Sequence, residues 1–249
     1  MRILLTNDDG IHAPGLALLE KIARQLSDDV TVCAPAEEQS GAGHSLTLHM
    51  PVRLQQFGDR RFAVTGTPTD AVNLALRRLF DTPPDILISG INFGENLADD
   101  VTYSGTISAA MEGALAGIPA IALSQSLRDR GYGYAAAEAW AAKVLGPLLE
   151  LPMARRTVIN VNFPPLPADE VQGIRVVRQG FHDYARGSVV ESTDPRGRPY
   201  YWFGLENIEH TLDHGTDLEA VEEGYIAITP LQVDLTHYAA LGTLAERFG

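Results

Sequence analysis

The chain has 249 residues, of which 45% are hydrophobic and 20% charged; this balance is typical of folded globular proteins and excludes a generally disordered chain. Nineteen basic residues against 32 acidic ones give a net charge of −13, which argues against a protein that binds duplex nucleic acid or an anionic membrane surface. The N-terminal apolar run is too short for a signal peptide and no apolar stretch approaches the ~20 residues of a membrane span, so we expect a cytoplasmic protein.

Short apolar strands alternate with helices through the first two thirds of the chain. Strands are predicted at 3–5, 30–34, 62–64, 86–88, 120–123 and 158–161, and helices at 14–26, 68–79, 104–117 and 134–145. Strands of this kind, separated by helices, indicate a mostly parallel sheet that is covered on both faces. We therefore predict a Rossmann-like three-layer α/β sandwich as the catalytic core, over residues 1–180.

One further strand is predicted from period-two alternation. Apolar residues from Leu46 to Leu54 alternate with polar ones, which is typical of a half-exposed strand. This strand is expected to return through Gly58 and Asp59 to the strand at 62–64.

The rhythm of strands and helices ends near residue 180. Residues 181–217 are polar, with a turn sequence at Asp194–Gly197 and an aromatic cluster at Tyr200–Phe203, which predicts a β-hairpin. A strand at 225–229, expected to return to a sheet, and a short helix at 239–248 complete a hairpin and C-terminal arm over residues 181–249. Because an isolated hairpin is barely stable in water, its aromatic face needs a covering surface, which is either its own subunit or a second one. The late position of the arm favours exchange between subunits, and we predict a homodimer or homotetramer.

Two adjacent carboxylates, Asp8 and Asp9, come directly after the first strand. Asn7-Asp8-Asp9-Gly10 is also a good turn sequence, so the position decides between a plain turn and a site. In a doubly wound sheet, ligands bind beyond the carboxyl ends of the strands. Two carboxylates aimed at one point repel each other unless a cation or a proton lies between them, and Mg²⁺ or Mn²⁺ with oxygen ligands meets that need.

Other oxygen donors follow comparable strand ends. Ser40 comes after the strand at 30–34, and Asn92 after the strand at 86–88. Each by itself is an ordinary turn or capping residue. Together with Asp8 and Asp9 they form a mixed-oxygen metal site with room left for water or substrate, and attack on a phosphate by water is favoured because the Asp-x-Asp spacing of aspartyl-phosphate enzymes is missing.

The helix that begins after Ser104 carries small residues, Gly105 and Thr106, in its first turn. A plain serine N-cap is the alternative interpretation. A capping box would place Glu or Gln at position 107, where Ile107 stands, so the first N–H groups lack an acidic partner within the helix. Free N–H groups and the helix dipole favour a phosphate at this point.

These blocks, in this order, resemble the SurE family, the survival protein E nucleotidases, along essentially the whole chain. The residues that carry the resemblance are Ile3–Gly10, Ala13–Gly15, Gln39–Gly41, Ser45–Thr47, Gly66–Asp70, Ser89–Asn92, Asp100-Val101, Tyr103–Thr106, Asp194–Gly197, Gly224-Tyr225 and Thr229–Leu231. One departure is the acidic pair Glu37-Glu38, where family members often carry a basic residue; it concerns substrate preference rather than chemistry.

The resemblance implies a metal-dependent phosphomonoesterase that hydrolyses nucleoside 5′-monophosphates and also 3′-monophosphates, with short-chain polyphosphate as a further substrate. It implies one divalent ion per subunit, Mg²⁺ or Mn²⁺, on Asp8, Asp9, Ser40 and Asn92, with Asp8 and Asp9 catalytic. Asn96, Ser104, Gly105 and Thr106 are the implied phosphate contacts, and dimers or tetramers form by exchange of the C-terminal arm and hairpin. Two alternatives from other classes are a non-catalytic nucleotide or metal sensor and a metal-dependent glycosyltransferase, in which paired aspartates also bind a divalent ion.

Overall fold

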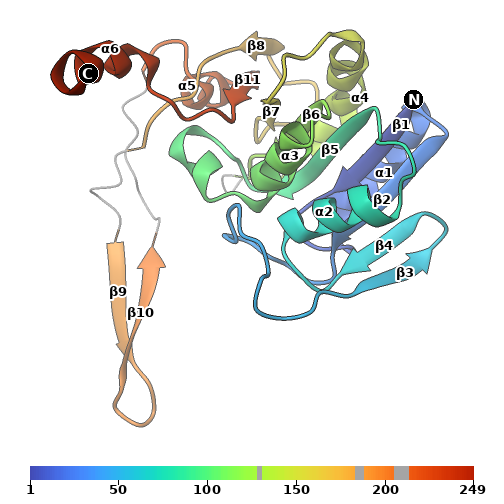
Figure 1. Ribbon diagram of the computed structural model, residues 1–249, viewed down its shortest axis with the longest axis horizontal. Helices are drawn as coiled ribbons and strands as arrows, with labels where there is room; N and C mark the ends of the chain where they lie inside the picture. Colours follow the sequence, from blue (N-terminus) through green and yellow to red (C-terminus); the bar gives the residue numbers. More distant parts are fainter. Residues whose placement is uncertain (128–130, 183–187, 205–212) are drawn as a thin grey trace.

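The computed structural model describes residues 1–127, 131–182, 188–204 and 213–249 (Figure 1). Within them, the central feature is a nine-stranded sheet that is parallel over most of its width. Its strands in spatial order are β3 (Leu54–Gly58), β4 (Arg61–Val64), β2 (Asp29–Pro35), β1 (Arg2–Thr6), β5 (Ile86–Phe93), β6 (Ala120–Gln125), β7 (Thr157–Phe163), β11 (Ile226–Gln232) and β8 (Ile174–Val176). The strands from β4 to β7 run parallel, whereas β3 and β11 pair antiparallel with β4 and β7. The predicted α/β class is confirmed.

Helices lie on both faces of this sheet, and the last helix of the chain projects away from it. They are α1 (Pro14–Leu26), α2 (Pro68–Arg78), α3 (Gly105–Leu115), α4 (Ala135–Glu150), α5 (Asp217–Glu222) and α6 (Tyr238–Phe248), and a 3-10 helix, η1 (Ala98–Thr102), precedes α3. Three short elements, η1, α5 and β8, were not predicted, and α4 continues through Pro147 to Glu150, five residues past its predicted end.

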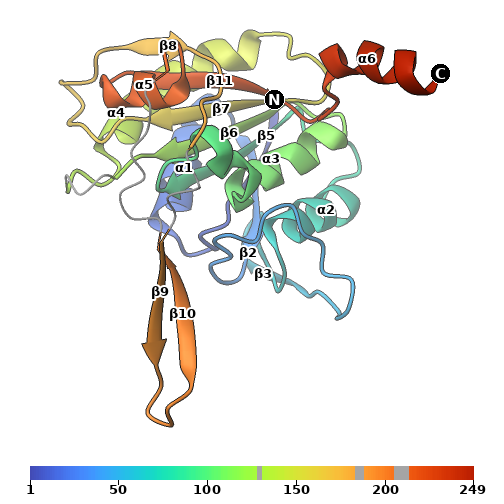
Figure 2. The ribbon, with the colours of Figure 1, turned by 90° about the vertical axis from the view of Figure 1, so that its left-hand side faces the viewer.

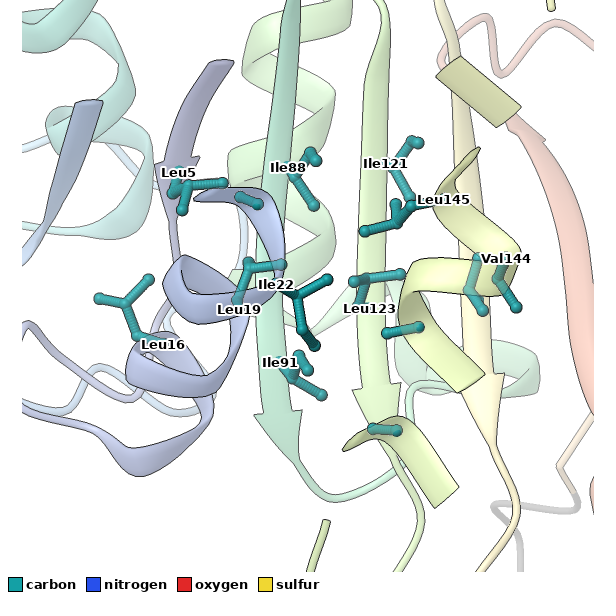
Figure 3. Packing of buried hydrophobic residues seen from close by; sticks show 14 of the residues in the cluster. Leu5, Leu16, Leu19, Ile22, Ile88, Ile91, Ile121, Leu123, Val144 and Leu145 are labelled. Atoms are coloured by element: carbon teal, nitrogen blue, oxygen red, sulfur yellow. The ribbon is translucent and has the colours of Figure 1, made fainter. Parts of the chain in front are cut away.

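The core on one face lies between the sheet and helices α1 and α4. Leu16, Leu19 and Ile22 of α1 are buried against Leu5, Ile88 and Ile91 of the sheet (Figure 3). Their spacing of three places them on one side of the helix, and Pro14 occupies its first turn, where no N–H partner is lost. Burial of each such side chain stabilises the fold by ~1.5–3 kcal/mol, which fixes the position of the loop between β1 and α1.

Helices α2 and α3 pack on the opposite face. The α2 residues Ala71, Val72 and Ala75 and the α3 residues Ile107, Ala110 and Ala114 share a second core with Leu4 and Leu87. Thr67 caps α2 as predicted, since its side chain accepts from Asp70 N and the Asp70 carboxylate accepts from Thr67 N.

The predicted strand over residues 46–54 is wrong, because β3 begins only at Leu54. The apolar members of the alternation, Leu46, Leu48 and Met50, are 51%, 79% and 66% exposed. Instead of joining a sheet, the segment is held to the start of α2, where Thr47 N donates to Asp70 Oδ1 at 3.1 Å and Thr67 Oγ1 donates to Ser45 O at 2.7 Å.

The C-terminal part of the chain extends away from the sheet at two places. The predicted hairpin forms from β9 (Ser188–Thr193) and β10 (Pro199–Gly204), and it stands off the body in both views (Figures 1 and 2). Residues 183–187 and 205–212 of the predicted hairpin region lie outside the described residues. Helix α6 has no buried residue and also projects outward (Figure 2). Among the helices of the described segments, none combines the length and the apolar character that crossing a membrane requires.

Candidate active site

The order of the strands changes direction beside β1. The chain passes from β1 to β2 on one side and later returns to β5 on the other, with Leu5 opposite Val32 and Thr6 opposite Ser89. Such a switch point leaves a crevice at the carboxyl ends of the strands, where α/β proteins of this kind bind ligands. Asp8 and Asp9 come just after β1, and Asn92 is the last residue but one of β5.

The turn after β1 is shaped by Asn7 and Gly10. Asn7 Nδ2 donates to Gly10 O at 3.0 Å, and Gly10 has a φ of +98°, which favours glycine. Gln39 N donates to Asp8 O at 2.8 Å, which joins this turn to the loop after β2. No separate role was predicted for Asn7, although it belongs to the turn sequence that was the signal; its side chain is fully buried, and its bond to Gly10 O closes the turn that carries the two aspartates.

Asp8 is the more deeply placed carboxylate, with 4% of its surface exposed. The Thr106 hydroxyl at the start of α3 donates to Asp8 Oδ1. Burial raises the pKa of Asp8, while hydrogen bonds from the hydroxyl and the backbone of Thr106 act in the opposite direction. Asp8 is therefore a carboxylate that a nearby positive charge would stabilise.

Asp9 lies at the rim of the same crevice. Its Oδ2 accepts a hydrogen bond from Phe93 N at 3.3 Å, which joins the end of β1 to the end of β5. Burial, and then the neighbouring charge of Asp8, raise the pKa of Asp9 to about 6. The structure thus brings together two carboxylates that each resist ionisation.

Ser40 lies on the loop after β2 and Asn92 near the end of β5, and the contacts of Gln39 with Asp8 and of Phe93 with Asp9 join both segments to the turn that carries the aspartates. Ser40 is exposed and its Oγ donates to Glu38 Oε1 at 2.8 Å. Asn92 Nδ2 donates to Gly94 O at 2.9 Å, so the amide oxygen is the atom that remains for a cation. A pocket of about 350 Å³ opens here, with Asp9, Glu38 and Ser40 on its polar side.

The start of α3 faces Asp8 from the opposite loop. Ser104 is the N-cap, and its Oγ accepts from Ile107 N at 3.1 Å, so this serine side chain is used for capping. Gly105 lies against Asp8, with no room between them for a side chain. The structure therefore brings Gly105 and Thr106 to Asp8, with the positive end of the α3 dipole directed at the crevice.

Asn96 lies deeper than the other predicted contacts. It is 5% exposed, its Nδ2 donates to Ser124 Oγ at 2.8 Å, and its backbone N–H donates to Asn162 Oδ1 at 2.8 Å. These bonds tie the loop after β5 to β6 and β7. The structure thus places Asn96 in the interior beside the crevice, and its contact with a phosphate stays a prediction.

The donors gathered here are mixed in kind. In the part of the chain that the structure describes, no three His, Cys, Asp or Glu side chains cluster in a way that could hold a metal ion. The crevice instead offers two carboxylates with one hydroxyl and one amide, all oxygen donors, which suit a hard divalent cation rather than a soft one.

Comparison with known proteins shows the same family over the full chain. The family model described as Survival protein SurE matches residues 3–186. A curated protein named 5′-nucleotidase SurE from Erythrobacter litoralis (strain HTCC2594) is 66% identical, with 100% of both chains covered, and one from Rhizorhabdus wittichii is 59% identical over 97% of each. The crystal structure of a SurE protein from Aquifex aeolicus superposes with a TM-score of 0.88 at 38% identity, covering 100% of both chains.

Proposed function

The chain belongs to the SurE family, and from this we propose that it is a nucleotidase, a phosphomonoesterase that hydrolyses nucleoside 5′-monophosphates to nucleoside and phosphate. The observation that carries the proposal is the pair Asp8 and Asp9 at the switch point, with the start of α3 against Asp8. A relative named 5′-nucleotidase SurE that is alike over its whole length makes the same chemistry the best-supported one for this crevice.

We further propose that the site binds one divalent ion, Mg²⁺ or Mn²⁺, through Asp8, Asp9, Ser40 and Asn92. The two carboxylates fit such an ion because burial, and then the charge of Asp8, raise the pKa of Asp9 to about 6, while burial raises the pKa of Asp8. A cation removes both penalties at once, since it stabilises the ionised form of each group. The amide nitrogen of Asn92 already donates to Gly94 O, which supports a role for its amide oxygen as a ligand.

The reaction requires water to attack phosphorus while the bond from phosphorus to the nucleoside oxygen breaks and that oxygen takes up a proton. A divalent ion supplies Lewis-acid charge to the phosphoryl group and the attacking water. Asp8, held by Thr106, and Asp9, held by Phe93 N, keep their carboxylates aimed into the crevice and orient that water. The positive end of the α3 dipole stabilises negative charge on the phosphoryl oxygens, with Asn96, Ser104, Gly105 and Thr106 as the proposed contacts. Two backbone N–H groups here already have partners, since Ser104 N donates to Asp100 O and Ile107 N to Ser104 Oγ.

The proposal extends to nucleoside 3′-monophosphates and short-chain polyphosphate as substrates. It also includes a homodimer or homotetramer built by exchange of the hairpin and C-terminal arm, residues 181–249. Exposed apolar residues on both parts support this assembly: Val189, Val190, Tyr201 and Trp202 on the hairpin and Leu241, Leu244 and Phe248 on α6.

A substrate panel tests the proposal. The purified chain is incubated with nucleoside 5′- and 3′-monophosphates and tripolyphosphate, each with Mg²⁺, Mn²⁺ or a chelator, and released phosphate is measured. We expect release from the nucleoside monophosphates that stops with the chelator. Binding of nucleotide without phosphate release would indicate a sensor, and transfer of sugar from a nucleotide sugar would indicate a glycosyltransferase; either outcome contradicts the proposal.

A further inference from the structure

The pocket beside Asp9 has two unlike sides. Asp9, Glu38 and Ser40 form the polar side, next to the proposed metal site, and Ala13, Pro14, Phe93 and Tyr134 form the apolar side. At about 350 Å³ it has the size of a small-molecule pocket. A nucleoside monophosphate has the same order of parts: a charged phosphate, a polar sugar and a flat apolar base.

Phe93, on the apolar side, has 59% of its surface accessible. A single exposed phenylalanine indicates nothing by itself. Here, however, the backbone N–H of the same residue donates to Asp9 Oδ2 at 3.3 Å, so the ring is anchored beside the reacting end of the pocket. The place of Phe93 in the structure is therefore fixed by its backbone contact with Asp9 and not by packing of its ring in the core.

Tyr134 continues the aromatic side. The rings of Phe93 and Tyr134 have centroids 5.7 Å apart and planes inclined at 51°, a common geometry for an aromatic pair. The Tyr134 hydroxyl is held by the backbone of Gly15, and burial, together with the charge of Asp9, raises its pKa to about 12. The hydroxyl is thus neutral and engaged, and the ring is a fixed part of the pocket.

The charges of the side chains that line the pocket limit which chemical groups can bind in it. Among its described lining residues none is basic, while Asp9 and Glu38 are acidic. Away from the proposed cation, the pocket therefore offers no side chain that would pair with an anionic group. A neutral, flat ring is not repelled, and aromatic side chains bind nucleobases by stacking, with little dependence on which base is present.

We propose that this pocket is the nucleobase subsite, in which the base stacks on Phe93 and packs against Tyr134 while the phosphate lies between Asp9 and the start of α3. The inference rests on the proposed nucleotidase function and adds a residue that determines specificity. Because stacking reads the face of a ring rather than its edge, the enzyme accepts several bases, with purines bound more tightly than pyrimidines.

The test compares two substrates that differ only in the base. Adenosine 5′-monophosphate and ribose 5-phosphate carry the same phosphate and sugar, so a base subsite lowers KM only for the first. Loss of stacking with one base is expected to raise KM by about tenfold to a hundredfold. We expect Phe93→Ala to raise KM for adenosine 5′-monophosphate by this factor with kcat nearly unchanged, and to leave KM for ribose 5-phosphate unaltered.

Two further variants separate stacking from structure. Phe93→Trp keeps an aromatic face and is expected to restore the low KM. Phe57→Ala removes another exposed phenylalanine, 47% accessible, which packs edge-on against His12 and does not line the pocket, so both KM values are expected to stay at the wild-type level. A readout without turnover is inhibition by adenosine, which we expect to weaken in Phe93→Ala and not in Phe57→Ala.

The outcomes distinguish this inference from the proposed function. Equal KM values of the wild type for the two substrates, or a rise of both KM values in Phe93→Ala, would overturn the base subsite while the phosphomonoesterase stands. Phosphate release from neither substrate by the wild type would overturn the proposed activity, and the subsite with it.

Discussion

Gly105, the first residue of α3, packs directly on Asp8: a β-carbon at position 105 would lie 2.7 Å from Cβ of Asp8 and 2.9 Å from its Oδ2. Neither neighbour is the far end of a flexible side chain that is free to turn away, since Thr106 also holds the Asp8 carboxylate. The distance between α3 and the end of β1 therefore depends on a glycine at this position.

Gly105→Ala is expected to lower phosphate release at least tenfold. Alanine is the better helix former by ~1 kcal/mol, so helix propensity alone would predict a gain in stability. The steric conflict moves Asp8 or the start of α3, and steady-state kinetics with Mn²⁺ measures the result. Gly242→Ala in α6, where no atom lies within 4 Å of the added carbon, is the matched control and should keep wild-type activity. Full activity of Gly105→Ala would show that the contact with Asp8 has no part in the reaction.

Asp9→Asn is expected to reduce turnover by at least about a hundredfold at saturating Mn²⁺, because it removes one charge from the cation site with little change of shape. Thermal unfolding supplies a second readout. Without metal the midpoint should not fall, since the repulsion between positions 8 and 9 is relieved. Mn²⁺ raises the unfolding midpoint of the wild type, and at a concentration a hundredfold above Kd it adds ~2.7 kcal/mol to the free energy of unfolding. In Asp9→Asn this rise in the midpoint should largely disappear.

The control for that variant is Asp28→Asn, which removes an exposed carboxylate before β2, at the opposite end of the sheet. It should retain both activity and the Mn²⁺-dependent rise in midpoint. An Asp9→Asn variant that still responds to Mn²⁺ like the wild type would contradict the metal assignment.

Asp70→Asn is expected to destabilise the protein at pH 7 by about 1–3 kcal/mol, the range for buried hydrogen bonds to a charged group. Burial opposes ionisation of Asp70, but hydrogen bonds from Thr47 and Thr67 outweigh it and lower its pKa below 3.8. Because the folded-state pKa is lowered, this stabilisation is present above the unfolded-state pKa and is lost as the pH falls through the folded-state value. Urea unfolding at pH 7 and pH 3 should therefore show a difference between the two proteins that narrows at pH 3; a difference independent of pH would contradict this account.

Light scattering is expected to give a mass of two or four times 26.9 kDa for the wild type. Replacement of residues 186–204 by a short Gly/Ser linker, or the double change Leu241→Glu and Leu244→Glu on α6, should lower that mass because apolar contact surface is lost. Leu151→Glu is the control, since Leu151 is similarly exposed, at 58%, but lies after α4. A monomeric wild type, or a mass unchanged in both variants, would exclude assembly through the arm.

Local sequence patterns correctly predicted those elements whose structure depends only on residues close together in the sequence. The spacing of Leu19, Ile22 and Leu26 predicted a helix with one apolar side, and Thr67-Pro68 followed by Asp70 predicted the start of another. The strand predicted from the alternation at Leu46, Leu48 and Met50 is absent there, since β3 begins at Leu54. Period-two alternation indicates which side chains would lie on the same side of a strand, but a strand also needs a neighbouring strand to pair with. In the folded chain that segment pairs with the start of α2, a contact made across 23 residues.

By itself, the sequence determined the alternation of strands and helices, the hairpin, and the positions of Asp8, Asp9 and Ser40 after strands, because these depend on neighbours a few residues apart. Asn92 was expected after a strand that ends at residue 88, but it lies within β5, which continues to Phe93. The tertiary structure alone decided that α3 reaches Asp8 through Gly105 and Thr106, that Asn96 is turned toward Ser124, and that Phe93 and Tyr134 form one side of a pocket. Those contacts join residues that are 28 to 98 positions apart in the sequence, and they arise from the order of the strands in the sheet. No local periodicity encodes that order; it follows from how all the strands and helices bury their apolar surfaces together.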